Sequence, residues 1–262
     1  DLYRDLAYIL AEVNPAAGGP RNDLLSPFLR EGKVEIVPPG VVLDGGRTFT
    51  GCLFSNELVD AFPVHRVLQE GGEIREIYVT LQGPSFVEVT GPPSGPAVGE
   101  YLSLYGAPLE EGQRAEVNLR ALEWMEGVNR ALRRGFVLTI DYGYEAPELY
   151  HPDRRDGTLL GYFRHSLSSD PYRRVGFQDL TAHVNFTALI RKGESLGLRK
   201  EGYTEQYRFL ASLGLLQDLE NLESESPGRS GPEFLREKLA MRNFLIPEGM
   251  GRVFKVLAQS KG

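Results

Sequence analysis

Residues 55–63, with the sequence SNELVDAFP, hold one amide and two carboxylates within five positions. If a helical turn begins near Asn56, then Glu57 and Asp60 stand at i and i+3 on one face, at the positive end of the turn. The two carboxylates would then converge on one site. The same pattern also fits a plain helix N-terminus, in which Asn56 caps and the acidic residues only answer the helix dipole.

Other acidic residues directly follow apolar runs. Glu12 closes the run 6–11, and Asp141 follows the run 136–140. Open parallel sheets bind ligands beyond the carboxyl ends of their strands. At the end of the second strand of a nucleotide-binding sheet, an acidic residue commonly accepts hydrogen bonds from ribose hydroxyls, and Glu12 stands in such a place. The alternative is an exposed loop carboxylate.

Acidic residues at strand ends can bind a ligand together only if the strands form a parallel sheet, which needs crossover helices between them. The run 6–11 is continuous and apolar, which predicts a strand buried on both faces. Residues 22–31 form a helical pattern, and 34–37 and 52–55 are short apolar runs. Together with the run 136–140, this alternation predicts an α/β fold.

Further elements follow less regular patterns. Alternation on both sides of residues 70–73 predicts a β-hairpin, and the Pro- and Gly-rich stretch 89–99 predicts a loop. The best helical periodicity covers 112–134. Residues 144–185 lack strong periodicity and hold three of the four histidines, so we expect a functional segment there. The remaining predictions are helices at 186–196 and 235–244, an extended stretch at 202–209 and a closing edge strand at 252–259.

Composition narrows the class of protein. The 262 residues suffice for one large domain or two small ones. A net charge of -7 argues against a protein that tracks nucleic-acid phosphates, and a single cysteine argues against a disulfide-stapled secreted module. No apolar run approaches the ~18 residues of a membrane helix. No targeting segment is visible, and the sequence enters an apolar strand as though it starts partway into a domain.

Four motifs in order, followed by a closing one, resemble the MidA family of class I S-adenosylmethionine-dependent methyltransferases, which includes the mitochondrial complex I assembly arginine methyltransferase. The motifs are SNELVDAFPVH at 55–65, IDYG at 140–143, GTLLGYFRH at 157–165, GFQDLTAHVNF at 176–186 and MGRVFKVL at 250–257.

The resemblance implies a Rossmann-like sheet, mostly parallel with an antiparallel edge strand, in one catalytic domain over 1–262. It places a β-hairpin insertion at 64–100 and a substrate-side insertion at 144–215. The family's first strand and glycine-rich cofactor loop have no match in this sequence, so we expect either a gap or a substitute beside the strand that ends at Glu12, or further residues before Asp1. The implied cofactor is S-adenosyl-L-methionine.

The implied reaction is methylation of an arginine in a protein, with a respiratory complex I subunit as the expected partner. The expected location is the cytoplasm, or the mitochondrial matrix in a eukaryote, and a homodimer is compatible with the family. Nucleic acid is not expected as a partner.

Site roles follow from this reaction. A guanidinium is always charged and is a poor nucleophile, and carboxylates that pair with it can fix its plane. We therefore predict Asn56, Glu57 and Asp60 as catalytic residues, with Asn56 orienting the target nitrogen by analogy of fold. Glu12, Ser55 and Asn56 are predicted to bind the cofactor.

Five residues are predicted to contact the substrate: Asp141, Tyr142, His165, Asp179 and His183. Histidines and carboxylates gathered in this way could instead hold a metal for hydrolysis, but their spacing matches no recognised ligand pattern, and we predict no metal. A third hypothesis is a non-catalytic assembly factor that binds its partner through 144–185.

Overall fold

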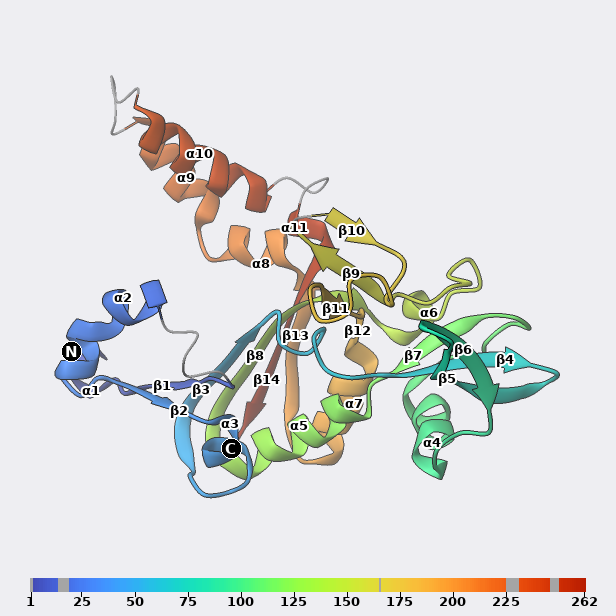
Figure 1. Cartoon of the computed structure of the whole chain (residues 1–262). Helices are drawn as coiled ribbons and strands as arrows, with labels where there is room; N and C mark the ends of the chain where they lie inside the picture. Colours follow the sequence, from blue (N-terminus) through green and yellow to red (C-terminus); the bar gives the residue numbers. More distant parts are fainter. Residues whose placement is uncertain (1, 14–18, 165, 225–230, 246–249) are drawn as a thin grey trace.

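The computed structural model describes residues 2–13, 19–164, 166–224, 231–245 and 250–262, and every structural statement refers to these residues. The chain forms a mixed α/β fold in which helices pack against a central sheet, and a second sheet lies beside it (Figure 1).

The central sheet has the order β3 (Phe49–Asn56), β8 (Leu132–Tyr144), β14 (Phe254–Lys261) and β13 (Arg199–Glu205). The short β12 (Val184–Asn185) pairs in parallel with the end of β8. β3 is parallel to β8, and β14 is antiparallel to both its neighbours. The predicted antiparallel strand is therefore present. It lies inside the sheet rather than at its edge, because β13 pairs along its free side.

The N-terminal strands form a separate sheet. β1 (Tyr8–Ala11) and β2 (Val34–Val37) pair in parallel, and α2 (Gly19–Arg30) connects them. In the ranges that the structure describes, neither strand pairs with β3, so the expected gap beside the strand that ends at Glu12 is present. The prediction that this strand is buried on both faces is wrong. Tyr8 is 51% exposed, and none of the four side chains of β1 is fully buried.

Two helices pack together beside the central sheet and build its core. α5 (Leu119–Ala131) and α7 (Phe186–Ser195) each begin with an asparagine cap. The side chain of Asn118 accepts a hydrogen bond from the Ala121 amide at 2.9 Å. The side chain of Asn185 accepts one from the Ala188 amide at 3.1 Å. Their buried apolar side chains meet those of β8 and β14 in one cluster, which includes Trp124, Met125, Val128, Leu189, Val137 and Leu257. Each cap therefore fixes where a helix begins beside the sheet.

The second sheet is larger than the predicted hairpin. Its order is β6 (Ser85–Gly91), β5 (Glu73–Gln82), β4 (His65–Glu70) and β7 (Arg114–Val117), all antiparallel. The β4–β5 hairpin is confirmed. The predicted helix at 112–134 is wrong at its start, because residues of β7 alternate into the core of this sheet and α5 begins only after Asn118.

The predicted loop at 89–99 is also wrong in part. β6 continues to Gly91, and α4 (Pro96–Tyr105) begins within the range. Proline is favoured in the first turn of a helix, where its missing N–H group has no partner to lose. α4 buries Val98 and Tyr101 against the second sheet.

The segment predicted as irregular contains short regular elements. After α6 (Ala146–Leu149), the strands β9 (Leu160–Phe163), β10 (Ser166–Ser168) and β11 (Asp179–Thr181) form an antiparallel sheet with β9 in the middle. We call these three strands the small sheet. Strands of three or four residues are too short to leave a clear period in the sequence.

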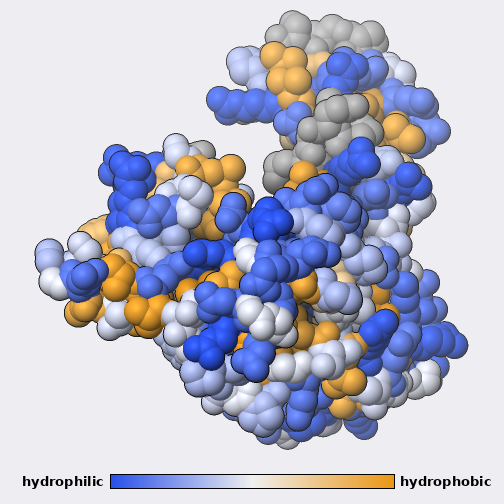
Figure 2. Space-filling model, turned by 90° about the vertical axis from the view of Figure 1, so that its right-hand side faces the viewer, coloured by the Kyte–Doolittle hydropathy of each residue, from blue (hydrophilic) through white to orange (hydrophobic). Residues whose placement is uncertain are grey.

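The C-terminal part adds α8 (Gln206–Ser212), α9 (Leu215–Ser224), α10 (Pro232–Leu245) and α11 (Met250–Val253) before β14. α9 and α10 lie against each other and project from the body, and hydrophobic side chains show on their surface (Figures 1 and 2). No described helix is long and apolar enough to cross a membrane.

Candidate active site

A cavity of about 700 Å³ opens beyond the carboxyl ends of β3 and β8, where parallel sheets bind ligands. Its wall is formed by the loop after β3, the end of β8, the small sheet and the start of β14. The lining residues are Glu57, Asp60, Ala61, Tyr142, Tyr162, Asp179, Thr181, His183, Val253 and Phe254.

Five of the residues predicted from the sequence line this cavity: Glu57, Asp60, Tyr142, Asp179 and His183. They come from three separate segments, of which the first and last residues are 126 positions apart in the chain, and the fold brings them together.

Ala61, Thr181, Val253 and Phe254 also line the cavity and were not predicted from the sequence. Thr181 had a usable signal, because it follows Asp179 at i+2 and strand alternation places both on one face. Val253 and Phe254 had none, since their position depends on the long path of the chain through α8 to α11.

The loop after β3 is not a helical turn as predicted. The amides of Leu58, Val59 and Asp60 instead converge on Oδ2 of Asp141, at 3.2, 2.9 and 3.4 Å. Glu57 has a φ of 48°, a left-handed conformation that costs energy in a residue with a side chain. Asp141 therefore takes the amides that a helix would have used, and the turn brings both carboxylates to the cavity.

Asp141 does not line the cavity. Its side chain is fully buried, and Oδ1 also accepts from the Tyr142 amide at 3.0 Å. Burial and the nearby Asp60 carboxylate raise the pKa of Asp141 to about 7. The predicted contact with substrate is thus replaced by a structural role, in which Asp141 holds the loop that carries Glu57 and Asp60.

Asp60 is buried and accepts a hydrogen bond at Oδ2 from the hydroxyl of Tyr142. Its other oxygen, Oδ1, is buried and has no hydrogen-bond partner among the described groups. Burial raises the pKa of Asp60, and the charge of Glu57 raises it further. Burial together with Asp60 also raises the pKa of Tyr142, so its hydroxyl remains a donor. Because Oδ1 of Asp60 has no described donor and lies beside the Glu57 carboxylate, this part of the cavity favours a cationic ligand.

Aromatic rings complete the wall around these carboxylates. The Tyr142 ring centroid lies 5.5 Å from that of Phe254 and 5.6 Å from that of His183, both edge to face. His183 also lies 5.4 Å from the Tyr144 ring. Aromatic rings attract cations through their negatively charged faces. The cavity therefore combines the two kinds of group that bind a desolvated cation.

His183 is positioned by a chain of hydrogen bonds. Its amide donates to Oγ1 of Thr158 at 3.0 Å, and that hydroxyl donates to Oε2 of Glu116 at 2.8 Å. The neighbouring Ala182 amide donates to the backbone oxygen of Asp60 at 3.0 Å. The carboxylate loop and the His183 segment are thereby fixed to each other.

The pH dependence of stability tests the environment of His183. Burial lowers the pKa of His183 to about 4, and the charge of Arg154 acts in the same direction. The unfolded chain then binds a proton near pH 6.5 that the folded chain refuses, so stability is full above pH 6.5 and falls toward pH 4. We expect the contribution of His183 to the free energy of unfolding to decrease by up to about 3 kcal/mol over this window, while Asp141, whose pKa is raised to about 7, contributes in the opposite direction.

Urea unfolding at several pH values measures this decrease. His183→Gln removes the His183 contribution, so between pH 6.5 and 4 its free energy of unfolding should fall less, or rise more, than that of the unmodified chain. His151→Gln serves as the matched control, because this side chain is exposed. Equal slopes for the unmodified chain and His183→Gln would contradict the buried neutral imidazole.

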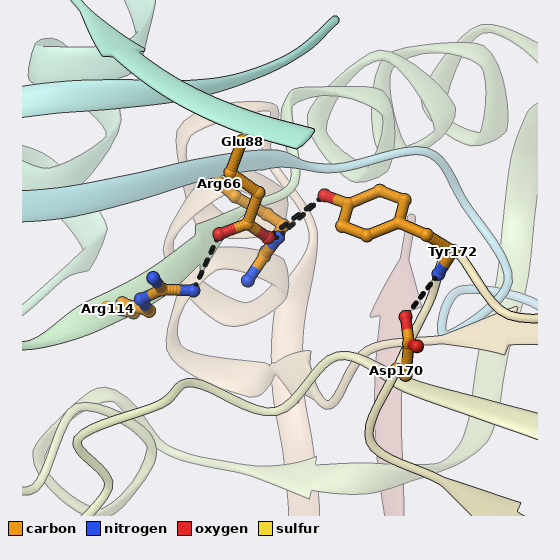
Figure 3. Close-up of polar contacts among 5 residues, drawn as sticks. All are labelled: Arg66, Glu88, Arg114, Asp170 and Tyr172. Atoms are coloured by element: carbon orange, nitrogen blue, oxygen red, sulfur yellow. Dashed lines mark hydrogen bonds and ion pairs between the residues drawn. The ribbon is translucent and has the colours of Figure 1, made fainter. Parts of the chain in front are cut away.

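A polar network joins the small sheet to the second sheet (Figure 3). Glu88 of β6 accepts hydrogen bonds from Arg66, from Arg114 at 2.8 Å and from the Tyr172 hydroxyl at 3.0 Å. Burial opposes the charge of Glu88, but the hydrogen bond and charge of Arg66 lower its pKa, so it remains ionised. Tyr172 is further held by its amide, which donates to Asp170 at 2.9 Å. The loop between β10 and β11 is therefore anchored away from the cavity.

The residues predicted to bind the cofactor lie at two strand ends. Ser55 and Asn56 end β3, and Glu12 follows β1, where its amide donates to Val37 at 2.9 Å. The Ser55 hydroxyl is buried without a hydrogen-bond partner in the described chain. Asn56 donates to Oε1 of Glu57 at 3.2 Å, which connects this region to the cavity. An unsatisfied hydroxyl and a carboxylate at the strand ends are polar groups that a nucleoside ligand can bond.

The remaining predicted substrate contact, His165, and the alternative metal site find no placement in the cavity. His165 lies outside the described residues, so its predicted contact is not addressed by the structure. Among the residues that are described, no three or more histidine, cysteine or acidic side chains cluster to hold a metal, and the hydrolase hypothesis gains no support from them.

Comparison with known proteins gives two kinds of match. A family model described as "Putative S-adenosyl-L-methionine-dependent methyltransferase" matches residues 1–204. Two crystal structures from Burkholderia thailandensis each superpose with a TM-score of 0.81 at 28% identity over 97% of this chain. One is described as a "likely methyl transferase" bound to S-adenosyl-homocysteine, the other as an uncharacterized protein of the same superfamily. The chain spans 64% and 66% of their lengths. No curated protein matches it.

Proposed function

The chain belongs to the family described as putative S-adenosyl-L-methionine-dependent methyltransferases, and from this membership we propose that it methylates an arginine side chain of a protein. The methyltransferase resemblance and the cofactor expected from the motifs agree with the family description. The observation that carries the arginine proposal is the cavity that joins Glu57 and Asp60 to aromatic walls beside Asn56.

The cofactor supplies a methyl group on a positively charged sulfur. In our proposal, the Glu12 carboxylate accepts hydrogen bonds from the ribose hydroxyls, and Ser55 uses its unsatisfied hydroxyl toward the same ligand. Asn56 stands between this region and the cavity and orients the acceptor nitrogen through its amide oxygen. These residues lie at the strand ends where the fold binds nucleotides.

Glu57 and Asp60 form the clamp for the acceptor. A guanidinium presents parallel N–H groups that match carboxylate oxygens, and such pairs fix its plane. Asp60 holds one oxygen toward Tyr142 and leaves the other free for this contact. Drawing positive charge toward the clamped nitrogens leaves more electron density on the nitrogen that attacks. Alignment of donor and acceptor then supplies much of the rate.

Methyl transfer also requires that the acceptor nitrogen lose a proton. A nitrogen–carbon bond forms as the sulfur–methyl bond breaks, and the attacking nitrogen loses one proton. Glu57 is exposed at the mouth of the cavity and can pass that proton to water. Asp179 and His183 contact the remainder of the acceptor side chain in this proposal. A respiratory complex I subunit, in the cytoplasm or the mitochondrial matrix, is the acceptor that the sequence resemblance favours.

Two peptides that differ in one group test the proposal. Citrulline has the shape of arginine but no charge, so the carboxylate clamp should reject it. We expect methyl transfer from labelled cofactor to an arginine peptide to exceed transfer to the matched citrulline peptide by about 10²-fold or more. A lysine peptide is the control for charge without guanidine geometry. Equal rates for arginine and citrulline would refute the clamp.

A further inference from the structure

The outer face of the small sheet differs from the face that lines the cavity. Strand alternation places Tyr162 and Asp179 on the cavity side, and it places their neighbours Phe163 and Leu180 on the opposite side. Leu180 is 44% exposed although it is a large apolar side chain. The outer face therefore presents apolar groups to solvent directly above the candidate active site.

Two guanidinium groups lie against the Phe163 ring on this face. The guanidinium carbon of Arg174 lies 4.5 Å from the ring centroid, and that of Arg164 lies 5.2 Å from it. Both arginines have positive φ angles, 59° and 48°. With Glu57, they are the only non-glycine residues in the described ranges that have this conformation. Such strain is found mainly where a protein fixes a functional side chain.

Among the residues that the structure describes, these arginines have no acidic partner. Neither Arg164 nor Arg174 forms an ion pair with any carboxylate that the structure describes, and the same holds for the exposed neighbour Arg173. In contrast, Arg66 and Arg114 of the second sheet both pair with Glu88. The chain has a net charge of -7, so this group of unpaired arginines makes the outer face positively charged in contrast to the chain as a whole.

Large apolar side chains extend the same surface. Phe177 is 77% exposed and Val175 is 53% exposed, both in the loop that follows Arg174. This loop is held in place, because Gln178 donates to the backbone oxygen of Pro171 at 2.9 Å and Tyr172 is bonded to Glu88. A fixed loop that exposes apolar groups between arginines has the composition of a protein-binding surface.

We propose that this outer face is the docking surface for an acidic, apolar segment of the protein substrate. The proposal rests on the proposed function, since it assigns the segment to the methylated protein. Carboxylates of the partner would pair with Arg164 and Arg174, and its apolar side chains would cover Phe177 and Val175. The target arginine would then reach the cavity from the same polypeptide. Acidic residues near the target arginine in the partner's sequence would then determine which protein is methylated.

Binding of short fluorescein-labelled peptides tests the docking surface. Each peptide carries one arginine among alternating leucine and phenylalanine, with either glutamate or glutamine at the remaining positions. We expect fluorescence anisotropy to show at least about 10-fold tighter binding of the glutamate peptide, and high salt to remove the difference. The double variant Arg164→Gln/Arg174→Gln should lose this preference, and Phe177→Ser should weaken binding of both peptides.

The matched control is Arg133→Gln/Arg134→Gln, which removes the same charge at the opposite end of β8. It should keep the preference for glutamate. Equal binding of both peptides by the unmodified chain, or equal losses in the two double variants, would overturn the docking surface. The docking surface would also be overturned if single-stranded RNA displaced the labelled peptide at a lower concentration than the unlabelled glutamate peptide does. That result would indicate a nucleic-acid partner.

Methyl transfer separates this inference from the proposed function. If both peptides are methylated without any preference in binding, the docking surface is wrong and the proposed function stands. If the glutamate peptide binds through the arginines but its own arginine is never methylated, the surface stands and the proposed function fails.

Discussion

Glu57→Gln is expected to lower the rate of methyl transfer by about 10²-fold to 10³-fold, the size of effect seen when one group that stabilises a transition state is removed. The change preserves the shape of the side chain but removes its charge, so one arm of the clamp no longer pairs with the guanidinium. Affinity for the cofactor should be largely kept, because Glu57 faces the acceptor cavity. Single-turnover transfer from labelled cofactor measures the rate.

Glu123→Gln is the matched control for this variant. Glu123 is exposed on α5, and within the described part of the chain its one ion pair is with Arg120, so its replacement should leave the rate unchanged. Calorimetric titration with S-adenosyl-homocysteine checks that both variants bind the cofactor product alike. Turnover of Glu57→Gln at the rate of the unmodified chain would remove Glu57 from the clamp.

Asp141→Ala is expected to lower the free energy of unfolding by about 3–5 kcal/mol, the cost of leaving several buried amide donors without an acceptor. The alanine would leave the amides of Leu58, Val59 and Asp60 without their acceptor. Asp141→Asn keeps a carbonyl oxygen at the same place and should cost less. Urea unfolding followed by tryptophan fluorescence measures the difference, since Trp124 lies in the adjoining core.

Asp218→Ala on α9 provides the control, because that carboxylate is exposed in a helix without buried residues. It should change stability by less than about 0.5 kcal/mol. If Asp141→Ala were as mild as Asp218→Ala, the loop that carries Glu57 and Asp60 would not depend on Asp141.

Elements with a simple period were predictable from the sequence. Alternation and paired glycines located the β4–β5 hairpin, where Gly71 and Gly72 have φ angles of 62° and 80°. Helical spacing located α7. The start of α5 was missed because β7 carries apolar residues whose alternation blends with the helical period that follows.

The loop after β3 shows why local pattern was insufficient at the site. Residues 57–60 carry the composition of a capped helical turn, and their amides would have served one. Asp141, 81 positions from Asp60, takes these amides instead. No local pattern reports a contact at that separation, so the turn was predicted wrongly, although Glu57 and Asp60 both line the cavity.

The strand-end rule located the site better than it assigned roles. It pointed to Asp141 and Tyr142 together, but adjacent strand residues face opposite sides. Tyr142 therefore lines the cavity and Asp141 lies buried behind the loop. Which of the two faces the ligand depends on the register of β8 with β3, and the register is fixed by pairing across the sheet.

Tandem mass spectrometry of the arginine peptide after turnover tests the central claim most directly, because it identifies the atom that receives the methyl group. A cavity that clamps a guanidinium predicts the label on a guanidine nitrogen, with loss of that product in Glu57→Gln. A label on lysine, on a carboxylate or on the peptide amino group, unaffected by Glu57→Gln, would contradict it.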